Sequence, residues 1–118
     1  MNYQEALERL NGRTSRKVGN NTYLHTHAAG LPIKDHRPDI ICLQLYATNI
    51  IKWHADGRIV LNSGGYRTVT TKRRMNQFLG PLGRVWQCSR QWAFYPLDAN
   101  GVLMPGEPVP FNDNMAVR

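Results

Sequence analysis

An Asp-Gly pair at residues 56–57 is the feature that most constrains the fold of this 118-residue chain. It is flanked by two β-prone runs, NIIKWH and RIVLNS. Asp-Gly between two such runs is one of the best short-range signals for a β-hairpin. The apolar residues 40–47 predict a neighbouring strand just before the hairpin. We therefore expect a β-sheet at the centre of the chain.

Helices are predicted on either side of this central sheet. The N-terminal run NYQEALERLNGR places its apolar residues on one helical face, with Asn2 as N-cap and Gly12 at the end. A second helix is predicted to begin with Thr70 or Thr71 as its N-cap. It is predicted to stop at Gly80, because a proline follows that residue.

The other segments are predicted from turn residues and composition. Residues 13–21 are polar and basic and indicate a loop that leads into a strand. Residues 28–39 contain two prolines and indicate a second loop. Residues 84–97 suggest two strands around a turn at 89–90. The proline-rich residues 105–118 predict a tail that is extended or frayed.

The domain organisation follows from these elements. The chain shows no internal repeat and no linker, and its length is within the range of one compact domain. We therefore expect a single α+β domain over residues 1–118. It combines a small antiparallel β-sheet, a meander with hairpins, with one or two short helices.

The charge of the chain is strongly positive and unevenly distributed. The formal net charge is +7, with a pI near 9.9. Residues 13–91 hold thirteen Lys or Arg against three Asp, a net charge of +10 for that segment. Such an excess is informative about partners rather than about the fold. It favours nucleic acid or another polyanion, or an acidic protein surface.

Residues 63–74, SGGYRTVTTKRR, place three cations where the second helix is predicted to begin. Positive charge is unfavourable there because of the helix dipole. One interpretation is a solvated face. The other is an anion site, where helix N–H groups, threonine hydroxyls and cations bind a phosphate, and Gly64 and Gly65 allow close approach. The candidate residues, with a second basic group in the predicted loop, are Arg13, Arg16, Lys17, Tyr66, Arg67, Thr70, Thr71, Lys72, Arg73 and Arg74.

Aromatic residues are interleaved with these cations. Trp53, Trp86 and Trp92 lie in predicted strands, and we expect them in the core, because a small domain needs large apolar side chains there. Tyr66 follows two glycines and is the aromatic residue we expect to be exposed. Exposed rings would allow nucleobases to stack on them.

Metal-binding and redox motifs are weak in this sequence. His25 and His27 would share one face of a strand, but zinc-finger and H-E-x-x-H spacings are absent. The P-loop spacing is absent as well. We therefore expect no metal and no cofactor. Cys42 and Cys88 lie in apolar runs and are expected to be buried free thiols rather than a disulfide framework.

Catalytic groups are equally sparse. His54 and Asp56 flank the predicted tight turn, which is typical of turn chemistry. A small nuclease is the enzymatic alternative, with His25, His27 or His54 acting together with Lys72 as general acid and base. We nevertheless expect a protein that is not an enzyme.

No segment has the composition of a signal peptide or of a membrane span. The two cysteines in apolar runs suit a reducing compartment. The sequence therefore predicts a soluble cytoplasmic protein with no membrane contact.

Two stretches, GRTSRKVGNNTYL and NSGGYRTVTTKRRMNQFL, carry a resemblance to known proteins. They resemble a group of small proteins encoded by tailed phages and related mobile elements. Members pair an N-N-T-Y-L-like strand with a G-G-[WY]-R-T-V-T-T-K segment, and an aromatic VWQ strand follows. The resemblance covers roughly residues 11–95. It implies a phage accessory gene whose product acts in the host bacterial cytoplasm, and it implies no catalytic residues.

Two functional hypotheses follow, besides the small nuclease. The first is an accessory protein that binds nucleic acid through the basic residues Arg67, Lys72, Arg73 and Arg74. The second is an inhibitor of a host defence or nucleic-acid enzyme, anti-CRISPR-like, that binds a host protein or a nucleic-acid-bound host complex. Tyr66 or the proline-rich tail would then supply the apolar centre of the interface. The sequence does not predict an oligomeric state.

Overall fold

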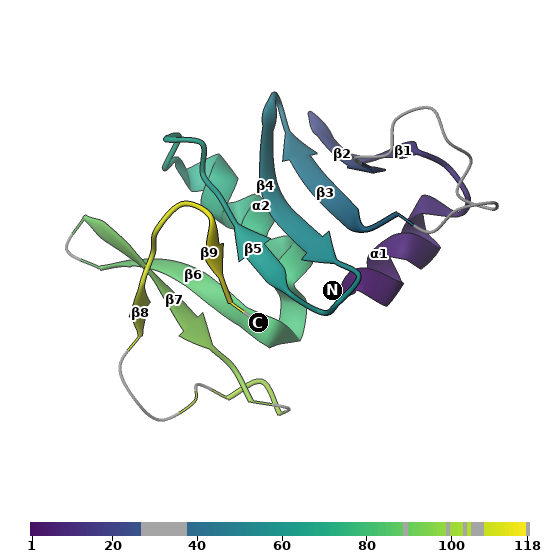
Figure 1. Cartoon of the computed structure of the whole chain (residues 1–118). Helices are drawn as coiled ribbons and strands as arrows, with labels where there is room; N and C mark the ends of the chain where they lie inside the picture. Colours follow the sequence, from purple (N-terminus) through teal and green to yellow (C-terminus); the bar gives the residue numbers. More distant parts are fainter. Residues whose placement is uncertain (27–37, 89, 99, 103, 105–107, 118) are drawn as a thin grey trace.

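The computed structural model of the chain describes residues 1–26, 38–88, 90–98, 100–102, 104 and 108–117. In this part of the chain, antiparallel strands form two sheets and two α-helices pack against them, so that the fold is α+β (Figure 1). The predicted loop at residues 28–39 falls almost entirely outside the described residues. His27 and His36 also fall outside them.

The larger sheet has six strands in the order β1-β2-β3-β4-β5-β9. Each described pair of neighbours in it is antiparallel. Its strands are β1 (Ser15–Gly19), β2 (Thr22–Thr26), β3 (Ile40–Leu45), β4 (Thr48–His54), β5 (Ile59–Leu61) and β9 (Met115–Ala116). The hairpin predicted around Asp56-Gly57 is confirmed as β4–β5, with Gly57 at a positive φ of 99°.

The smaller sheet has three strands in the order β6-β7-β8. They are β6 (Gly83–Cys88), β7 (Gln91–Pro96) and β8 (Val109–Pro110). The two strands predicted around residues 89–90 are therefore confirmed. The expectation of one sheet is wrong, because helix α2 (Val69–Leu79) and the 3-10 helix η2 (Gly80–Leu82) separate β5 from β6, and β9 occupies the edge beside β5.

Both helices cover the same face of the six-stranded sheet. Leu24, Leu43 and Ile51 lie in register across three adjacent strands. They share one buried core with Leu10 of helix α1 (Tyr3–Leu10) and with Met75 of α2. Since side chains alternate across a strand, the residues between them point to the other side of the sheet. We call the two sides the helix-covered face and the opposite face.

The opposite face carries a row in which polar and apolar residues are mixed. His25, Cys42, Lys52 and Val60 lie directly opposite one another, in that order, across strands β2 to β5. Tyr23 shares this face because it alternates with the buried Leu24. This face therefore differs in chemistry from the apolar helix-covered face.

The N-terminal helix is confirmed together with its cap. The Asn2 side chain accepts a hydrogen bond from the Glu5 N–H at 2.9 Å. The helix ends at Leu10, and Asn11 rather than Gly12 is the C-cap, with the left-handed φ of 52°. Asn is one of the few residues other than Gly that adopt this conformation readily.

The prediction of a loop over residues 13–21 is wrong, because Ser15–Gly19 forms strand β1. This strand lies at the edge of the sheet and pairs only with β2. Its residues are exposed or half-buried, so it does not need the apolar alternation by which strands are recognised. Charged residues on such a strand also discourage pairing with other chains.

The proline-rich C-terminal residues contribute to both sheets where they are described. Val109 pairs with Phe94 of β7, and Met115 pairs with Leu61 of β5. Phe111, between the two strands, is buried and packs edge-to-face against Trp92 at 5.3 Å between ring centroids. Residues 108–117 are therefore part of the packed structure.

Candidate anion-binding surface

Helix α2 begins earlier than the sequence predicts. Thr68, rather than Thr70 or Thr71, is the N-cap, and its hydroxyl accepts a hydrogen bond from the Thr71 N–H at 3.2 Å. The hydroxyl oxygens of Thr68 and Thr71 also lie 3.0 Å apart, and Thr71 is only 4% exposed. Thr71 is therefore engaged inside the cap, whereas Thr70 is exposed at the first turn.

This earlier start explains why cations are tolerated in the segment. Lys72 is the fourth residue of the helix, and its N–H donates to the Thr68 carbonyl at 3.1 Å. The effect of the helix dipole falls off within the first turn. Lys72, Arg73 and Arg74 lie beyond that turn, so they oppose the dipole less than the sequence suggests.

Helical geometry separates the three cations. Successive residues are rotated by about 100° around the helix axis, so three neighbours cannot share one direction. Arg73 projects away from the buried face that includes Met75 and Phe78, and it is exposed. Lys72 and Arg74 flank that buried face and are half-buried. The cations therefore surround the helix instead of converging.

Arg74 and Arg67 are engaged in contacts within the fold. The Arg74 Nη1 atom donates to the Gln77 side chain at 2.9 Å. Its guanidinium carbon lies 3.6 Å from the position that a Cβ atom would take on Gly19, so it packs on the β1–β2 turn. The Arg67 guanidinium lies over the ring of Phe111, 5.2 Å from the centroid. Lys72 and Arg73 are therefore the α2 cations best placed for an external anion.

The second basic group is divided between the two faces of the sheet. Arg16 pairs with Leu24 on the helix-covered side, and its Nη1 atom donates to the Arg9 carbonyl at 2.6 Å, near the end of α1. Lys17 pairs with Tyr23 and points to the opposite face. The structure therefore brings Arg74 near the β1–β2 turn but directs Lys17 away from α2.

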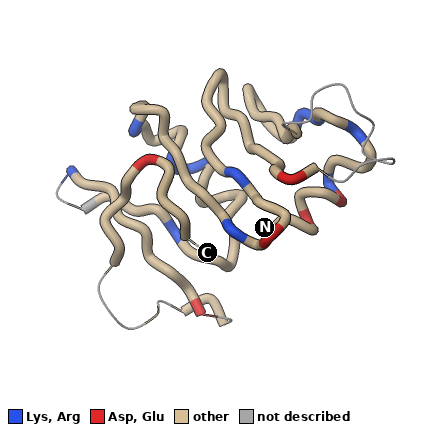
Figure 2. Tube along the Cα trace, viewed as in Figure 1, with Lys and Arg blue, Asp and Glu red and all other residues tan. Residues whose placement is uncertain are grey.

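Few of the cations are neutralised by acids. Figure 2 shows Lys and Arg positions on both α-helices and on strands of both sheets. Among the residues that the structure describes, Arg58 and Asp56 form the one side-chain ion pair, at 3.0 Å. In the described part of the chain, most Lys and Arg side chains therefore have no ion-pair partner.

The loop before α2 is held by the C-terminal segment. The Asp113 Oδ1 atom accepts hydrogen bonds from the N–H of Ser63 at 2.8 Å and from its hydroxyl at 2.7 Å. Ser63 is fully buried, and its hydroxyl in turn accepts from the Gly65 N–H at 3.2 Å. These hydrogen bonds therefore stabilise the backbone conformation of residues 63–65.

Low pH is expected to weaken the hydrogen bonds between Asp113 and Ser63. Partial burial alone would raise the pKa of Asp113, but the hydrogen bonds from Ser63 and the nearby Arg67 outweigh it, so the pKa lies below its ordinary value of 3.8. A carboxylate whose pKa is lower in the folded state than in the unfolded state stabilises the fold at pH values above the unfolded-state pKa. This stabilisation is lost as the pH falls through the folded-state pKa.

We therefore expect Asp113→Asn to lower the free energy of unfolding by about 1 kcal/mol at neutral pH, a small effect because the carboxylate is largely exposed. Urea unfolding of both proteins at a series of pH values measures the difference. It is expected to be constant above pH 4 and to shrink in stronger acid. A difference in the free energy of unfolding that does not change with pH would contradict the lowered pKa of Asp113.

Tyr66 is 67% exposed, which confirms its predicted exposure. It lines a shallow hollow of about 260 Å³ at the start of α2, together with Tyr46, Thr48 and Thr68. Tyr46 is 65% exposed, so two tyrosine rings border the same hollow.

The sequence interpretation missed a second hollow, on the outer face of the smaller sheet. This hollow has a volume of about 440 Å³ and is lined by Arg84, Trp86, Tyr95, Leu97 and Gly101. Trp86 is 56% exposed, so the prediction that it lies in the core is wrong.

The sequence did contain a signal for this arrangement. Trp53 and Trp92 are buried as predicted. The register of strands β6 and β7 pairs Trp86 with Ala93, and alternation along β7 then separates the buried Trp92 from Ala93. Trp86 must therefore lie on the face opposite to Trp92. Its direction follows from the hairpin register, not from its hydrophobicity.

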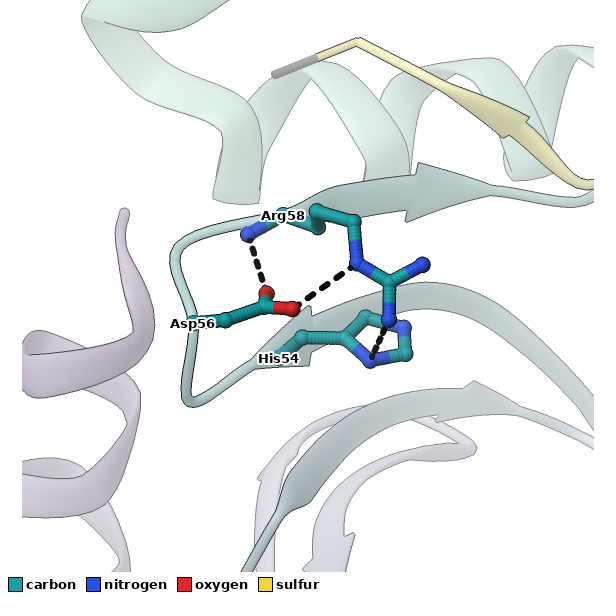
Figure 3. A network of polar contacts seen from close by, with 3 residues as sticks. All are labelled: His54, Asp56 and Arg58. Atoms are coloured by element: carbon teal, nitrogen blue, oxygen red, sulfur yellow. Dashed lines mark hydrogen bonds and ion pairs between the residues drawn. The ribbon is translucent and has the colours of Figure 1, made fainter.

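His54 and Asp56 form a network within their turn (Figure 3). Asp56 accepts hydrogen bonds from the backbone N–H and the Nε atom of Arg58, both at 3.0 Å. Arg58 Nη2 lies 3.3 Å from His54 Nδ1. The backbone hydrogen bond is the largest influence that lowers the pKa of Asp56, and the Arg58 side chain adds to it. These contacts stabilise the β4–β5 turn, in agreement with the turn chemistry predicted for it.

The groups considered for a nuclease are not brought together. His25 lies on the opposite face of the larger sheet, and its Nε2 atom is 2.7 Å from the Asn49 Oδ1 atom. Lys72 lies on α2, which packs on the helix-covered face. His54 belongs to the opposite face as well, since it pairs with Ile40, which alternates with the buried Ile41. His25 and His54 are therefore separated from Lys72 by the sheet, and His27 lies outside the described residues.

Neither a metal centre nor a reactive thiol is found in the described part of the chain. No group of three or more His, Cys, Asp or Glu side chains is arranged to hold a metal among the described residues. Cys42 is a free and fully buried thiol, as predicted. Burial raises its pKa to about 11, and the charge of Lys52 only partly opposes this. Cys42 is therefore protonated at neutral pH, and the side chain of Cys88 lies outside the described residues.

No family model, no curated protein and no solved structure matches this chain. Neither of the two described α-helices has the length and apolar character required to cross a membrane.

Proposed function

We propose that this chain is a non-enzymatic nucleic-acid-binding domain that contacts the phosphate backbone through exposed cations. The observation that carries the proposal is the uncompensated positive charge: +7 overall, with a single side-chain ion pair among the described residues. A surface of this kind attracts polyanions over a long range. Contacts to phosphate fix the position of a nucleic acid without reading its sequence.

Lys72 and Arg73 are the residues proposed to make the central phosphate contacts. Arg73 is exposed and the half-buried Lys72 flanks the buried face of α2, and no acidic side chain pairs with either of them among the described residues. The exposed Thr70 and Tyr66 lie near the same helix start and provide further polar contacts. Arg74 is assigned to packing on the β1–β2 turn rather than to the ligand.

The resemblance to small phage proteins suggests the setting of this activity. We propose an accessory protein of a phage or mobile element that acts on nucleic acid inside the host cell. The alternative, an inhibitor of a host defence enzyme, draws support from the two exposed tyrosines that border the hollow at the start of α2. Aromatic residues of this kind dominate protein–protein hot spots. Such an inhibitor would bind one protein partner with little dependence on salt.

The double variant Lys72→Gln/Arg73→Gln tests the proposal. Each phosphate contact to a single strand contributes about 0.7 to the slope of log affinity against log salt concentration. The loss of two contacts is therefore expected to reduce that slope by about 1.4. Fluorescence anisotropy with a labelled oligonucleotide, at several salt concentrations, measures it.

The matched control is Lys17→Gln/Lys52→Gln, which removes the same charge from the opposite face of the sheet. This control is expected to bind with nearly the wild-type slope. Equal reductions of the slope in the two variants would contradict the assignment of the phosphate contacts to α2. They would indicate that binding depends on the net charge of the chain and not on particular cations. A wild-type chain that binds no nucleic acid would contradict the proposed function itself.

A further inference from the structure

The outer face of the β6–β7–β8 sheet presents an aromatic side chain that its neighbours leave uncovered. Trp86 lies directly opposite Ala93, which pairs in turn with Pro110 of β8. Ala93 is too small to cover the indole ring. Tyr95, two residues further along β7, is within the diagonal reach of a large side chain on the facing strand. The result is an open hollow with two aromatic rings in its wall.

The charge in this hollow is positive. Arg84 pairs with Tyr95 across the hairpin, lies on the same face as Trp86, and is exposed. Asp98 follows Leu97 in the sequence but is not among the described residues that line the hollow. Its Oδ1 atom already accepts hydrogen bonds from the N–H groups of Asn100 and Val102, at 2.8 and 3.0 Å. A cation beside the exposed Trp86 ring and the half-buried Tyr95 therefore defines the chemistry of the site.

We infer that this hollow is a stacking site for an unpaired base of single-stranded nucleic acid, with Arg84 contacting an adjacent phosphate. The inference rests on the proposed function and specifies its substrate class. Bases in a duplex are stacked on one another and cannot lie flat on Trp86, whereas bases of a single strand stack readily on exposed aromatic rings. An apolar peptide in the same place would desolvate Arg84 without supplying an anion, which is unfavourable.

The test compares Trp86→Ala with Trp86→Phe in the full chain. Fluorescence anisotropy is measured with a labelled single-stranded oligonucleotide and with its duplex, at one fixed salt concentration. Loss of one base-stacking contact is expected to weaken single-strand binding about tenfold or more in Trp86→Ala. Duplex binding is expected to change less than about twofold, because phosphate contacts carry it. Trp86→Phe keeps an aromatic face and is expected to stay within about threefold of wild type.

Intrinsic fluorescence supplies a second measurement. The chain has three tryptophans, and Trp53 and Trp92 are both buried. Quenching by an unlabelled single-stranded oligonucleotide is therefore expected to come from Trp86 and to disappear in Trp86→Phe. Trp86 is exposed, so its variants are expected to unfold at the wild-type temperature, and a thermal scan checks this.

The possible outcomes separate this inference from the proposed function. If the wild-type chain binds nucleic acid but Trp86→Ala leaves the ratio of single-strand to duplex affinity unchanged, the stacking site is overturned and phosphate binding stands. If the wild-type chain binds neither form, both proposals are overturned. If Trp86→Ala instead converts a self-associated chain to a monomer in sedimentation, the hollow binds a second copy and the inference is wrong.

Discussion

Replacement of Trp53 with alanine is expected to lower the free energy of unfolding by about 3–5 kcal/mol. Trp53 is fully buried on the helix-covered face, within the core that the sheet forms with both helices. Its indole Nε1 atom donates to the Met1 carbonyl at 2.9 Å, and the Met1 amino group donates to the Leu79 carbonyl at 3.0 Å. The ring thus joins the N-terminus, the sheet and the end of α2. Its removal leaves both a cavity and a lost hydrogen bond.

Denaturant unfolding of Trp53→Ala, with Trp86→Ala as the matched control, measures this effect. The control makes the same chemical change on an exposed side chain, and it is expected to alter the free energy of unfolding by less than about 1 kcal/mol. Similar losses in the two variants would contradict the assignment of Trp53 to the core and of Trp86 to the surface.

Gly64→Ala is expected to lower the free energy of unfolding by about 2–5 kcal/mol. Two effects contribute to this loss. Gly64 has a φ of +61°, a left-handed conformation that costs an L-residue about 1–2 kcal/mol. A Cβ atom at this position would also lie 2.7 Å from the Thr48 Cγ2 atom. Because Thr48 is β-branched and stiff, relief of that overlap is expected to cost a further 1–3 kcal/mol or so.

Gly65→Ala separates the two effects. Gly65 also has a positive φ, +85°, but a Cβ atom there meets no heavy atom within 4 Å. Its replacement is therefore expected to cost only the backbone strain, about 1–2 kcal/mol. If both variants lose the same stability, the close packing of Gly64 on Thr48 is contradicted. The pair also tests whether these glycines serve the fold, as the structure indicates, or an approaching ligand.

The secondary structure could be predicted where local chemistry decides it. Asp56-Gly57 predicts its hairpin because Gly57 adopts the positive φ of the turn and Asp56 accepts a hydrogen bond from the Arg58 N–H. Asn2 predicts the start of α1 because its side chain accepts from the backbone of the first turn. Strand β1 could not be predicted in this way, since an edge strand with little buried surface does not require apolar alternation.

The division into two sheets depends on contacts that are distant in the sequence. Val60 and Leu61 of β5 pair with Ala116 and Met115 of β9, more than fifty residues later. No local pattern encodes such a pairing. Loop closure over that distance has an entropic cost that contacts elsewhere in the fold must offset. Local sequence patterns therefore predicted the α+β class but not the number of sheets.

Some features of the candidate site could likewise be predicted from the sequence, and others could not. The exposure of Tyr66 followed from its neighbours in the sequence, two glycines in a predicted loop. The separation of Lys72, Arg73 and Arg74 around α2 also followed from helical periodicity, once the helix was located. The packing of Arg74 on Gly19 could not be predicted in this way, because it joins α2 to a strand that lies more than fifty residues earlier in the sequence. The hollow at Trp86 required the register of the β6–β7 hairpin.

The measurement that tests the central claim most directly is the affinity of the wild-type chain for single-stranded and duplex oligonucleotides across a salt series. Binding through exposed cations predicts that log affinity falls linearly with log salt concentration, because each phosphate contact releases counterions. The stacking site predicts tighter binding of the single strand at every salt concentration. An affinity that is independent of salt, or an absence of binding to both forms at low salt, would contradict the account.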